Sequence, residues 1–229
     1  MRTEIVGTAL EAAAVLVCAI SGMITAARKN MDIVGTYCLA IVTAFGGGTL
    51  RDLLIDRRPF FWISHDQYLL IIVALCVAFV YSKPFHARAS RWHRQGLLVD
   101  AMGLALFTLT GVGFALEKGL PLFVSSLIGV ITGTFGGVLR DVASIEIPLL
   151  FRPGELYAIS SFAGAWVYIG GLRFGVPSGV AGILAALTIV GLRVVSHAFG
   201  VRVPDPLWIK REAKAIREIR STRSETRNS

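Results

Sequence analysis

The chain has 229 residues, of which 54% are hydrophobic and 17% are charged, with a mean hydropathy of +0.66 and a net charge of +8. Of its 38 charged residues, 12 lie in the last 30 positions. Soluble globular domains carry about 25% charged residues. This distribution excludes a soluble enzyme, a disordered chain and a secreted disulfide scaffold, and the positive charge fits the cytoplasmic bias of a membrane protein better than nucleic-acid binding.

Seven apolar segments are predicted to cross a membrane as helices, because a spanning helix needs about 20 mostly apolar residues. In chain order they are Ile5–Ala27, Ile33–Ile55, Tyr68–Tyr81, Leu97–Leu116, Leu120–Leu139, Leu156–Leu172 and Gly179–Val195. The third is short and is open to extension at both ends. The cysteines lie inside apolar runs without CxxC spacing, which suggests neither a metal site nor a redox motif. They are Cys18, Cys38 and Cys76.

Lysine and arginine counts predict the orientation of the chain in the membrane. With seven spans, the segments on the side of the N-terminus carry 6 of these residues, whereas those on the other side, including the tail, carry 17. Because cytoplasmic segments are enriched in Lys and Arg, we expect the N-terminus outside and the C-terminus in the cytoplasm. The basic tail at 200–229 is expected to be solvated or to lie on anionic lipid. Its single aromatic residue, Trp208, argues against nucleic-acid binding.

The chain contains an internal repeat with an offset of 89 residues. Without gaps, residues 7–81 match 96–170 at 14 of 75 positions, and the pattern GGxLRD recurs at 47–52 and 136–141. Each copy holds three spans, an odd number, so the second copy enters the membrane from the opposite face. This predicts two inverted three-helix repeats, a pattern that points to a permeation or substrate site. The expected units are residues 5–83, residues 94–173, a seventh transmembrane helix at 177–199 and the basic tail at 200–229.

Glycine-rich segments lie at matching positions of the second and fifth spans. FGGGTLRDLL occupies 45–54 and FGGVLRDVAS occupies 135–144. Only about 20 Å of helix fits between Ile33 and Phe45, so a helix break at these glycines would lie inside a hydrocarbon core of about 30 Å. The carbonyl end of a broken helix attracts a cation. The alternative is that the small residues let helices pack closely. The candidate helix-break residues are Gly46, Gly47, Gly48, Gly136 and Gly137.

An Arg-Asp pair follows each glycine segment. Charged residues at membrane depth are costly, and they are usually paired, inward-facing and functional. A structural ion pair or helix cap, a gating role and direct contact with a permeating ion are all open interpretations. The segment lacks the GxxxxGK(S/T) pattern and a preceding strand, which excludes a nucleotide site of that type. The candidates for pairing or gating are Arg51, Asp52, Arg140 and Asp141.

Two further acids and a set of hydroxyl residues are candidates for lining a pore. Glu11 and Asp100 occupy matching positions of the two repeats, where they could serve a cation path, a proton relay or a polar contact with a neighbouring helix. The hydroxyl groups gather on spans one, two, four and five, and could line a hydrated path or hold helices together. They are Ser21, Thr25, Thr43, Thr49, Thr108, Thr110, Thr132 and Thr134.

The paired motifs FGGGxxRD and FGGxxRD, one per three-helix repeat and followed by a seventh helix, resemble the prokaryotic relatives of the trimeric intracellular cation (TRIC) channels, a domain also catalogued as a glycine transporter domain. The resemblance covers about residues 5–197. It implies a homotrimer in the prokaryotic inner membrane. It also implies a pore in each subunit around the broken second and fifth helices, with potassium or another monovalent cation as the permeant ion. Neither enzymatic activity nor a cofactor is implied. The second motif has Phe135 where a third glycine would stand.

Two other functions stay open at this stage. A secondary carrier for a small amino acid such as glycine also needs broken helices and inverted repeats, and Glu11 or Asp100 could serve as its coupling acid. A structural membrane scaffold is the third possibility. The cost of placing charges at membrane depth argues against a scaffold.

Overall fold

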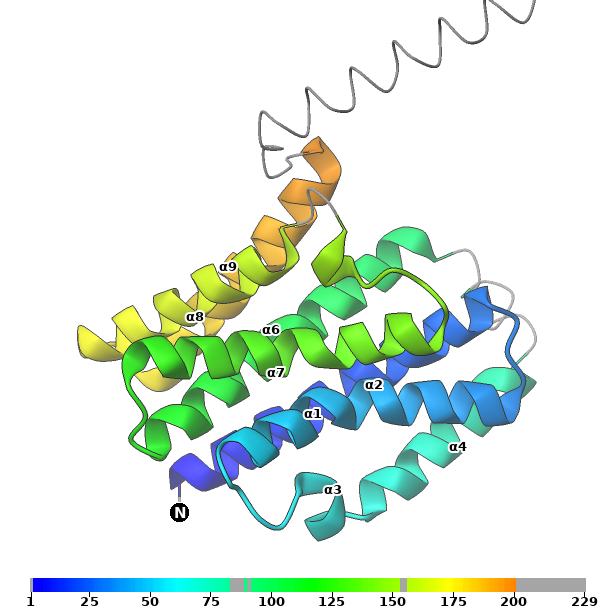
Figure 1. Cartoon of the computed structure of the whole chain (residues 1–229), viewed down its shortest axis with the longest axis horizontal. Coiled ribbons are helices and arrows are strands. Elements are labelled where there is room, and N and C mark those ends of the chain that lie inside the picture. The colour runs from blue at the N-terminus through cyan, green and yellow to red at the C-terminus, as the bar shows by residue number, and fades with distance from the viewer. Residues whose placement is uncertain (1, 83–88, 90–91, 153–155, 201–229) are drawn as a thin grey trace, which may run out of the picture.

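The computed structural model describes residues 2–82, 89, 92–152 and 156–200 of the chain, and gives no side-chain description at 2–6, 93 and 94. The predicted tail at 200–229 lies outside these residues from position 201 onward. The described part is helical and contains no strand. Its elements are α1 (Arg2–Arg28), α2 (Ile33–Leu54), α3 (Phe61–Ser64), α4 (Gln67–Tyr81), α6 (His93–Glu117), α7 (Leu122–Ala143), the 3-10 helix η1 (Leu149–Phe151), α8 (Tyr157–Arg173) and α9 (Ser178–Phe199) (Figure 1).

Each of the seven expected segments is helical. Five helices are long and apolar enough to cross a membrane: α1, α2, α6, α7 and α9. The third segment forms α4, which has 15 residues and does not extend at its N-terminal end, because α3 forms a separate turn before it. The segment at 156–172 forms α8, which has 17 residues. The fifth segment was placed too early: α7 starts at Leu122, after Pro121, and continues to Ala143.

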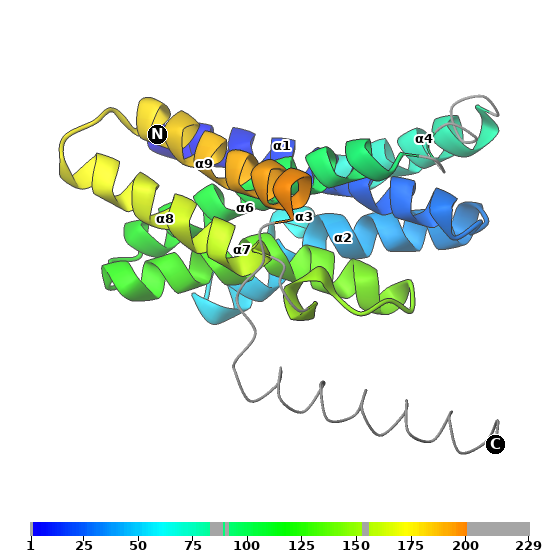
Figure 2. The same cartoon turned by 90° about the horizontal axis from the view of Figure 1, so that it is seen from above.

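Four helices form the centre of the molecule. Helices α2 and α7 lie side by side and run in opposite directions, with α1 and α6 behind them (Figure 1). Helix α4 packs on the flank formed by α1 and α2, and α8 and α9 pack together against α6 on the other flank, as Figure 2 shows from above. The centre is filled by small residues such as Ala14, Ala40 and Ala44 together with Phe107. Small residues let helix backbones approach closely in a membrane.

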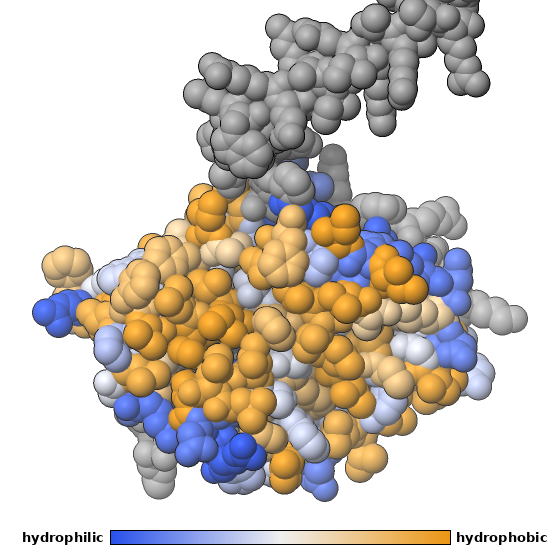
Figure 3. Space-filling view, viewed as in Figure 1, coloured by the Kyte–Doolittle hydropathy of each residue, from blue (hydrophilic) through white to orange (hydrophobic). Residues whose placement is uncertain are grey.

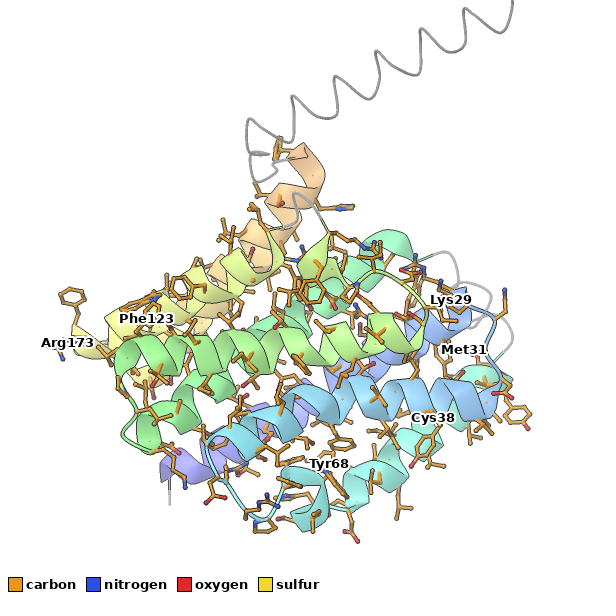
Figure 4. All side chains as sticks on the ribbon, in the orientation of Figure 1. Lys29, Met31, Cys38, Tyr68, Phe123 and Arg173 are labelled. Atoms are coloured by element: carbon orange, nitrogen blue, oxygen red, sulfur yellow. The ribbon has the colours of Figure 1, made fainter. Side chains whose placement is uncertain are left out.

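The outer surface is apolar along most of the helices and polar at their ends. Large side chains such as Leu70 on α4 and Leu187 on α9 are exposed. Figure 3 shows the apolar band on one face of the molecule, with hydrophilic residues gathered toward its two ends. Figure 4 places Arg173 and Lys29 at these opposite ends. An apolar surface of this extent is normal for a protein in contact with lipid and is rare on a soluble monomer.

Turns at matching positions of the two repeats have the same backbone shape. Asn30 and Gly119, which are 89 residues apart, both have positive φ, at 53° and 74°. Asp56 and Ile145, again 89 residues apart, have φ values of 48° and 58°. The backbone hydrogen bond from Arg57 N to Asp52 O, 2.8 Å, has its counterpart from Glu146 N to Asp141 O, also 2.8 Å. The repeat therefore extends to local backbone geometry.

The predicted helix breaks at the glycines are wrong. Helix α2 runs without interruption from Ile33 to Leu54, and α7 runs from Leu122 to Ala143, so the glycines at 46–48 and 136–137 lie inside regular helix. A glycine in a helix interior costs up to about 1 kcal/mol relative to alanine. Here the missing side chain lets two helices pack in close contact, and this contact offsets the loss of helix stability caused by the glycine. The Arg-Asp pairs also lie inside the helices, so they do not cap a break.

Candidate functional site

Helices α2 and α7 cross at their glycines. A Cβ atom at Gly47 would overlap the carbonyl oxygen of Thr132, and one at Gly136 would lie 2.6 Å from the carbonyl oxygen of Thr43. The contact is reciprocal, because Gly47 and Gly136 are 89 residues apart, as are Thr43 and Thr132. The two threonine hydroxyls donate to carbonyls of their own helices, at Leu39 and Ile128, at 2.6 Å each. The crossing is therefore a direct backbone contact.

A pair of equivalent contacts, one within each repeat, joins α1 to α2 and α6 to α7. A Cβ at Gly22 of α1 would lie 2.8 Å from the Cα of Ala40 on α2. A Cβ at Gly111 of α6 would lie 2.9 Å from the Cα of Gly129 on α7. Both pairs of positions differ by 89. Small residues thus set the spacing of all four central helices, which confirms the close-packing interpretation of the glycines.

The first buried charge cluster lies one helical turn beyond Gly47. It consists of Glu11, Arg51, Asp52 and Arg57. The Arg51 side chain is fully buried; it donates to the Glu11 carboxylate and to Asp52 Oδ1 at 2.7 Å. Arg57 Nη1 lies 3.3 Å from Glu11 Oε2 and 3.4 Å from Asp52 Oδ1. Both guanidinium groups also lie over the ring of Phe114, at 4.7 and 4.1 Å from its centroid. Two carboxylates therefore face two guanidinium groups.

The second cluster lies one turn beyond Gly136, and since α2 and α7 are antiparallel it lies on the opposite side of the crossing. Arg140 Nη1 donates to Asp100 Oδ1 and to Ser21 Oγ, at 2.6 Å each. Its Nε donates to Asp141 Oδ1 at 2.9 Å. The Asp141 carboxylate also accepts from the backbone N–H of Leu149 at 3.0 Å. Arg140 and Asp100 are separated by 40 residues, as are Arg51 and Glu11.

Helix α9 adds a cation to the second cluster. Arg193 is 1% exposed; its Nη2 lies 4.0 Å from Asp100 Oδ2, and its guanidinium lies 4.7 Å from the centroid of the Tyr157 ring. The Tyr157 hydroxyl lies 3.5 Å from Asp100 Oδ1. Sequence reasoning missed Arg193, Tyr157, Arg57 and Phe114 as members of these clusters. A single arginine in the apolar segment near the end of α9 was the available signal, because such a charge needs a partner inside the protein.

A cavity of about 210 Å³ opens at the second cluster. It is bounded by basic, acidic and hydroxyl side chains from α1, α6, α7 and α9 and from the segment after α7. A much smaller cavity of about 10 Å³ touches Glu11, Thr49 and Asp52 in the first cluster. Its volume is about that of one water molecule. The polar residues around the larger cavity include Ser21, Thr25, Arg28, Asp100, Arg140, Asp141, Glu146, Arg152, Arg193 and His197.

Glu146 bridges two basic residues at the edge of the larger cavity. Lys29 Nζ lies 2.7 Å from Glu146 Oε1, and Arg152 Nη2 lies 2.8 Å from Oε2. The hydrogen bond from Lys29, followed by the one from Arg152, lowers the pKa of this carboxyl below its ordinary value although partial burial opposes the shift. The carboxylate is therefore ionised at neutral pH, and the link between α1 and the segment after α7 would weaken only when acid protonates it.

The candidate hydroxyl residues divide between the cavities and the helix packing. Ser21 and Thr25 line the larger cavity and Thr49 lines the smaller one, whereas Thr43 and Thr132 lie at the crossing. The hydroxyls of Thr25, Thr108, Thr110 and Thr134 donate to backbone carbonyls of their own helices. In the described part of the chain, no group of three or more His, Cys, Asp or Glu could hold a metal ion.

The geometry of the site has counterparts in known proteins. A sequence model of the family described as "Glycine transporter" matches residues 8–84 and 97–173, two segments that are again offset by 89. The chain belongs to this family. Among the relatives of this chain, the inner membrane protein YadS of Escherichia coli is 32% identical over 202 residues, which is 88% of this chain and 93% of YadS. The membrane protein YvgT of Bacillus subtilis is 32% identical over 191 residues, which is 82% of this chain and 90% of YvgT.

Solved structures relate the chain to the TRIC channels. The structure of the TRIC trimeric intracellular cation channel orthologue from Rhodobacter sphaeroides is 32% identical, with a TM-score of 0.76 over 86% of this chain and 99% of that one. A second structure, from a study of conductance through TRIC cation channels, is 28% identical, with a TM-score of 0.74 over 86% of this chain and 95% of that one. This glycine transporter family member is therefore a prokaryotic relative of the TRIC channels and a multi-pass membrane protein.

Proposed function

We propose that the protein is a channel for monovalent cations, chiefly potassium, with a pore in each subunit of a homotrimer. The observation that carries this proposal is the 32% identity and 0.76 TM-score, over 86% of the chain, to a channel described as trimeric and cation-conducting. The arrangement of the two charge clusters around the α2–α7 crossing adds a physical basis.

The proposed pore follows the four central helices from one cluster to the other. The reciprocal contacts at Gly47 and Gly136 fit two halves that are related by a two-fold axis in the membrane plane, as inverted repeats require. In this arrangement the five long helices α1, α2, α6, α7 and α9 cross the membrane together with two shorter spans, α4 and α8. The carboxylates at both ends attract cations, and the hydroxyls of Ser21, Thr25 and Thr49 line the cavities where ions would enter. The crossing itself is the narrowest point.

The channel is expected to select cations over anions and to discriminate only modestly among monovalent cations. Glu11, Asp52, Asp100 and Asp141 supply negative charge, and each faces a neighbouring guanidinium group. The central helices keep their carbonyls in intrahelical bonds, so they do not form a ring of carbonyls like the potassium-channel filter. Reversal potentials of purified protein in a planar bilayer, measured under a potassium chloride gradient, test this. A reversal at the chloride potential would contradict it.

A carrier for a small amino acid is the second candidate function. The cavity of about 210 Å³ holds both carboxylates and guanidinium groups, which are the partners that the two charged ends of glycine need. The same bilayer preparation separates the two functions. Discrete potassium current steps are the result expected of a channel. Silent bilayers together with uptake of labelled glycine into proteoliposomes would show a carrier instead.

The two termini are expected on opposite sides of the membrane, with the C-terminus in the cytoplasm. Seven spans require opposite sides, and the 17-to-6 distribution of Lys and Arg sets the direction. Arg173 and Lys29 lie at opposite ends of the molecule, in keeping with this assignment (Figure 4). Reporters that are active in one compartment only, fused to each terminus in turn, provide the measurement. Signals from the same compartment at both ends would mean that α4 or α8 does not cross.

A further inference from the structure

Each charge cluster contains two carboxylates and two guanidinium groups, but the second guanidinium group comes from a different part of the chain in each cluster. In the first cluster, Arg57 follows α2 directly and lies 3.3 Å from Glu11. The equivalent position in the second repeat is Glu146, which carries the opposite charge and pairs with Lys29 and Arg152 instead. The missing cation comes from Arg193 on α9, which stands outside the repeat. The second cluster is thus completed by a helix that its own repeat does not contain.

Arg193 lies farther from its carboxylate than Arg57 does. Its Nη2 lies 4.0 Å from Asp100 Oδ2, beyond hydrogen-bond distance, and the guanidinium rests over the Tyr157 ring. Asp100 is buried to more than nine-tenths, and among the described residues its Oδ2 has no hydrogen-bond partner. Asp100 and Arg193 both line the cavity of about 210 Å³. A buried carboxylate oxygen that lacks a hydrogen bond and borders a cavity is an attractive position for a cation.

The charge balance of the cluster favours a monovalent cation at this position. Arg140 already bonds Asp100 Oδ1 and Asp141, so it neutralises one of the two carboxylates. Without Arg193, one negative charge would be left in a buried place, which a single positive charge balances. A divalent ion would need further carboxylate or carbonyl oxygens, and Asp100 offers one oxygen that is not hydrogen-bonded.

We propose that Asp100 Oδ2 is a binding site for a permeating monovalent cation and that Arg193 is a tethered competitor that occupies it. This deepens, and rests on, the proposed channel function. The Arg193 guanidinium supplies from within the protein the charge that a potassium ion would supply from solution. An ion enters the site when the Arg193 side chain moves away from Asp100, so the position of α9 controls access from the cavity to the crossing.

The test compares the parent protein with Arg193→Gln and Arg193→Lys in proteoliposomes. Glutamine removes the charge and keeps a polar chain of similar length, so potassium flux per assembled protein should rise at least threefold. Lysine keeps the charge, so flux should stay within about twofold of the parent. Arg173→Gln removes the same charge from an exposed position at the other end of the molecule and is the matched control. Equal flux from Arg193→Gln and the parent would overturn the proposal.

A binding measurement separates this proposal from the channel function. Melting temperatures are compared in potassium chloride and in N-methyl-D-glucamine chloride of equal ionic strength. A cation that binds the folded protein raises its stability, so Arg193→Gln should melt on the order of 2 °C higher in potassium, whereas the parent should not. The double variant Arg193→Gln/Asp100→Asn should lose the difference. The double variant removes one positive and one negative charge, so the buried charges of the cluster stay balanced. It therefore shows whether poor assembly of the single variant comes from the unbalanced charge of Asp100.

The outcomes distinguish the two proposals. If neither the parent nor any variant carries potassium, yet Arg193→Gln is stabilised by it, the cation site stands and the channel function fails. If the parent conducts and Arg193→Gln shows neither extra flux nor potassium-dependent melting, the channel function stands and the tethered competitor is wrong. If Arg193→Lys raises flux as much as Arg193→Gln, the effect is packing and the charge is irrelevant.

Discussion

Replacing Gly47 with alanine is expected to destabilise the protein strongly, although alanine is the better helix former. The new Cβ would overlap the carbonyl oxygen of Thr132, a backbone atom in α7 that cannot rotate away. Overpacking of this kind costs about 1–3 kcal/mol, which exceeds the gain of up to about 1 kcal/mol in helix propensity. Thermal unfolding in detergent, followed by size-exclusion profile, measures the effect. Gly136→Ala should behave alike, since its Cβ would lie 2.6 Å from the carbonyl oxygen of Thr43.

Gly48→Ala is the matched control for this prediction. It lies one residue further along the same helix and gives the same gain in helix propensity. The nearest atom to its new Cβ is Glu11 Oε1 at 3.6 Å, an ordinary contact distance. We expect it to melt at or slightly above the parent temperature. If Gly47→Ala and Gly48→Ala had the same melting temperature, the α2–α7 contact would not explain the glycine at position 47.

Replacing Arg51 with methionine is expected to cost about 3–5 kcal/mol of stability, the range for breaking a buried ion pair from one side. The Arg51 side chain is fully buried and bonds both Glu11 and Asp52. Without it, two buried carboxylates would share the partly exposed Arg57, whose contacts with them are longer than 3 Å. A loss of assembled protein at growth temperature is therefore the expected result, with thermal unfolding as the quantitative measure.

Two comparisons identify the cause. Arg58→Met removes the same charge from an exposed side chain 4.0 Å from Asp56, and surface pairs of this kind contribute about 0–1 kcal/mol. Adding Glu11→Gln to Arg51→Met leaves a single carboxylate, which Arg57 can neutralise. The double variant should therefore regain part of the stability that Arg51→Met loses. A double variant as unstable as the sum of its single changes would show that Arg51 acts through packing on Phe114 instead of through its charge.

The sequence was sufficient for the helices and for the repeat. Apolar length placed the seven helical segments to within a few residues, because lipid-facing helices must be apolar along their whole length. The GGxLRD pattern marked the glycines and the Arg-Asp pairs that the structure places at the α2–α7 crossing and in the charge clusters, although it predicted neither the crossing nor the other members of the clusters. The start of α7 was misplaced because Leu120 and Pro121 are apolar, yet Pro121 forms the cap from which the helix begins.

The errors arise where a residue's role depends on a distant partner. Local reasoning assigned a break to Gly46–Gly48, because glycine favours irregular backbone when it is considered alone. The partner that keeps the helix regular, the α7 backbone at Thr132, is 85 residues away from Gly47. Arg193 was not among the residues predicted for the site, and its position beside Asp100 and Tyr157 follows only from the packing of α9 against α6.

The reciprocal contacts of the central helices constrain how such a chain could have arisen. Each repeat presents a Gly–Thr surface on its second helix, and that surface is covered by the same surface of the other repeat. Residue pairs related by exchange are the mark of a contact between identical partners. A single three-helix unit would leave this surface bare, so it would need a second copy inserted with the reverse orientation. The chain holds the two surfaces together in one covalent unit, so the two halves are free to differ elsewhere, as Arg57 and Glu146 do.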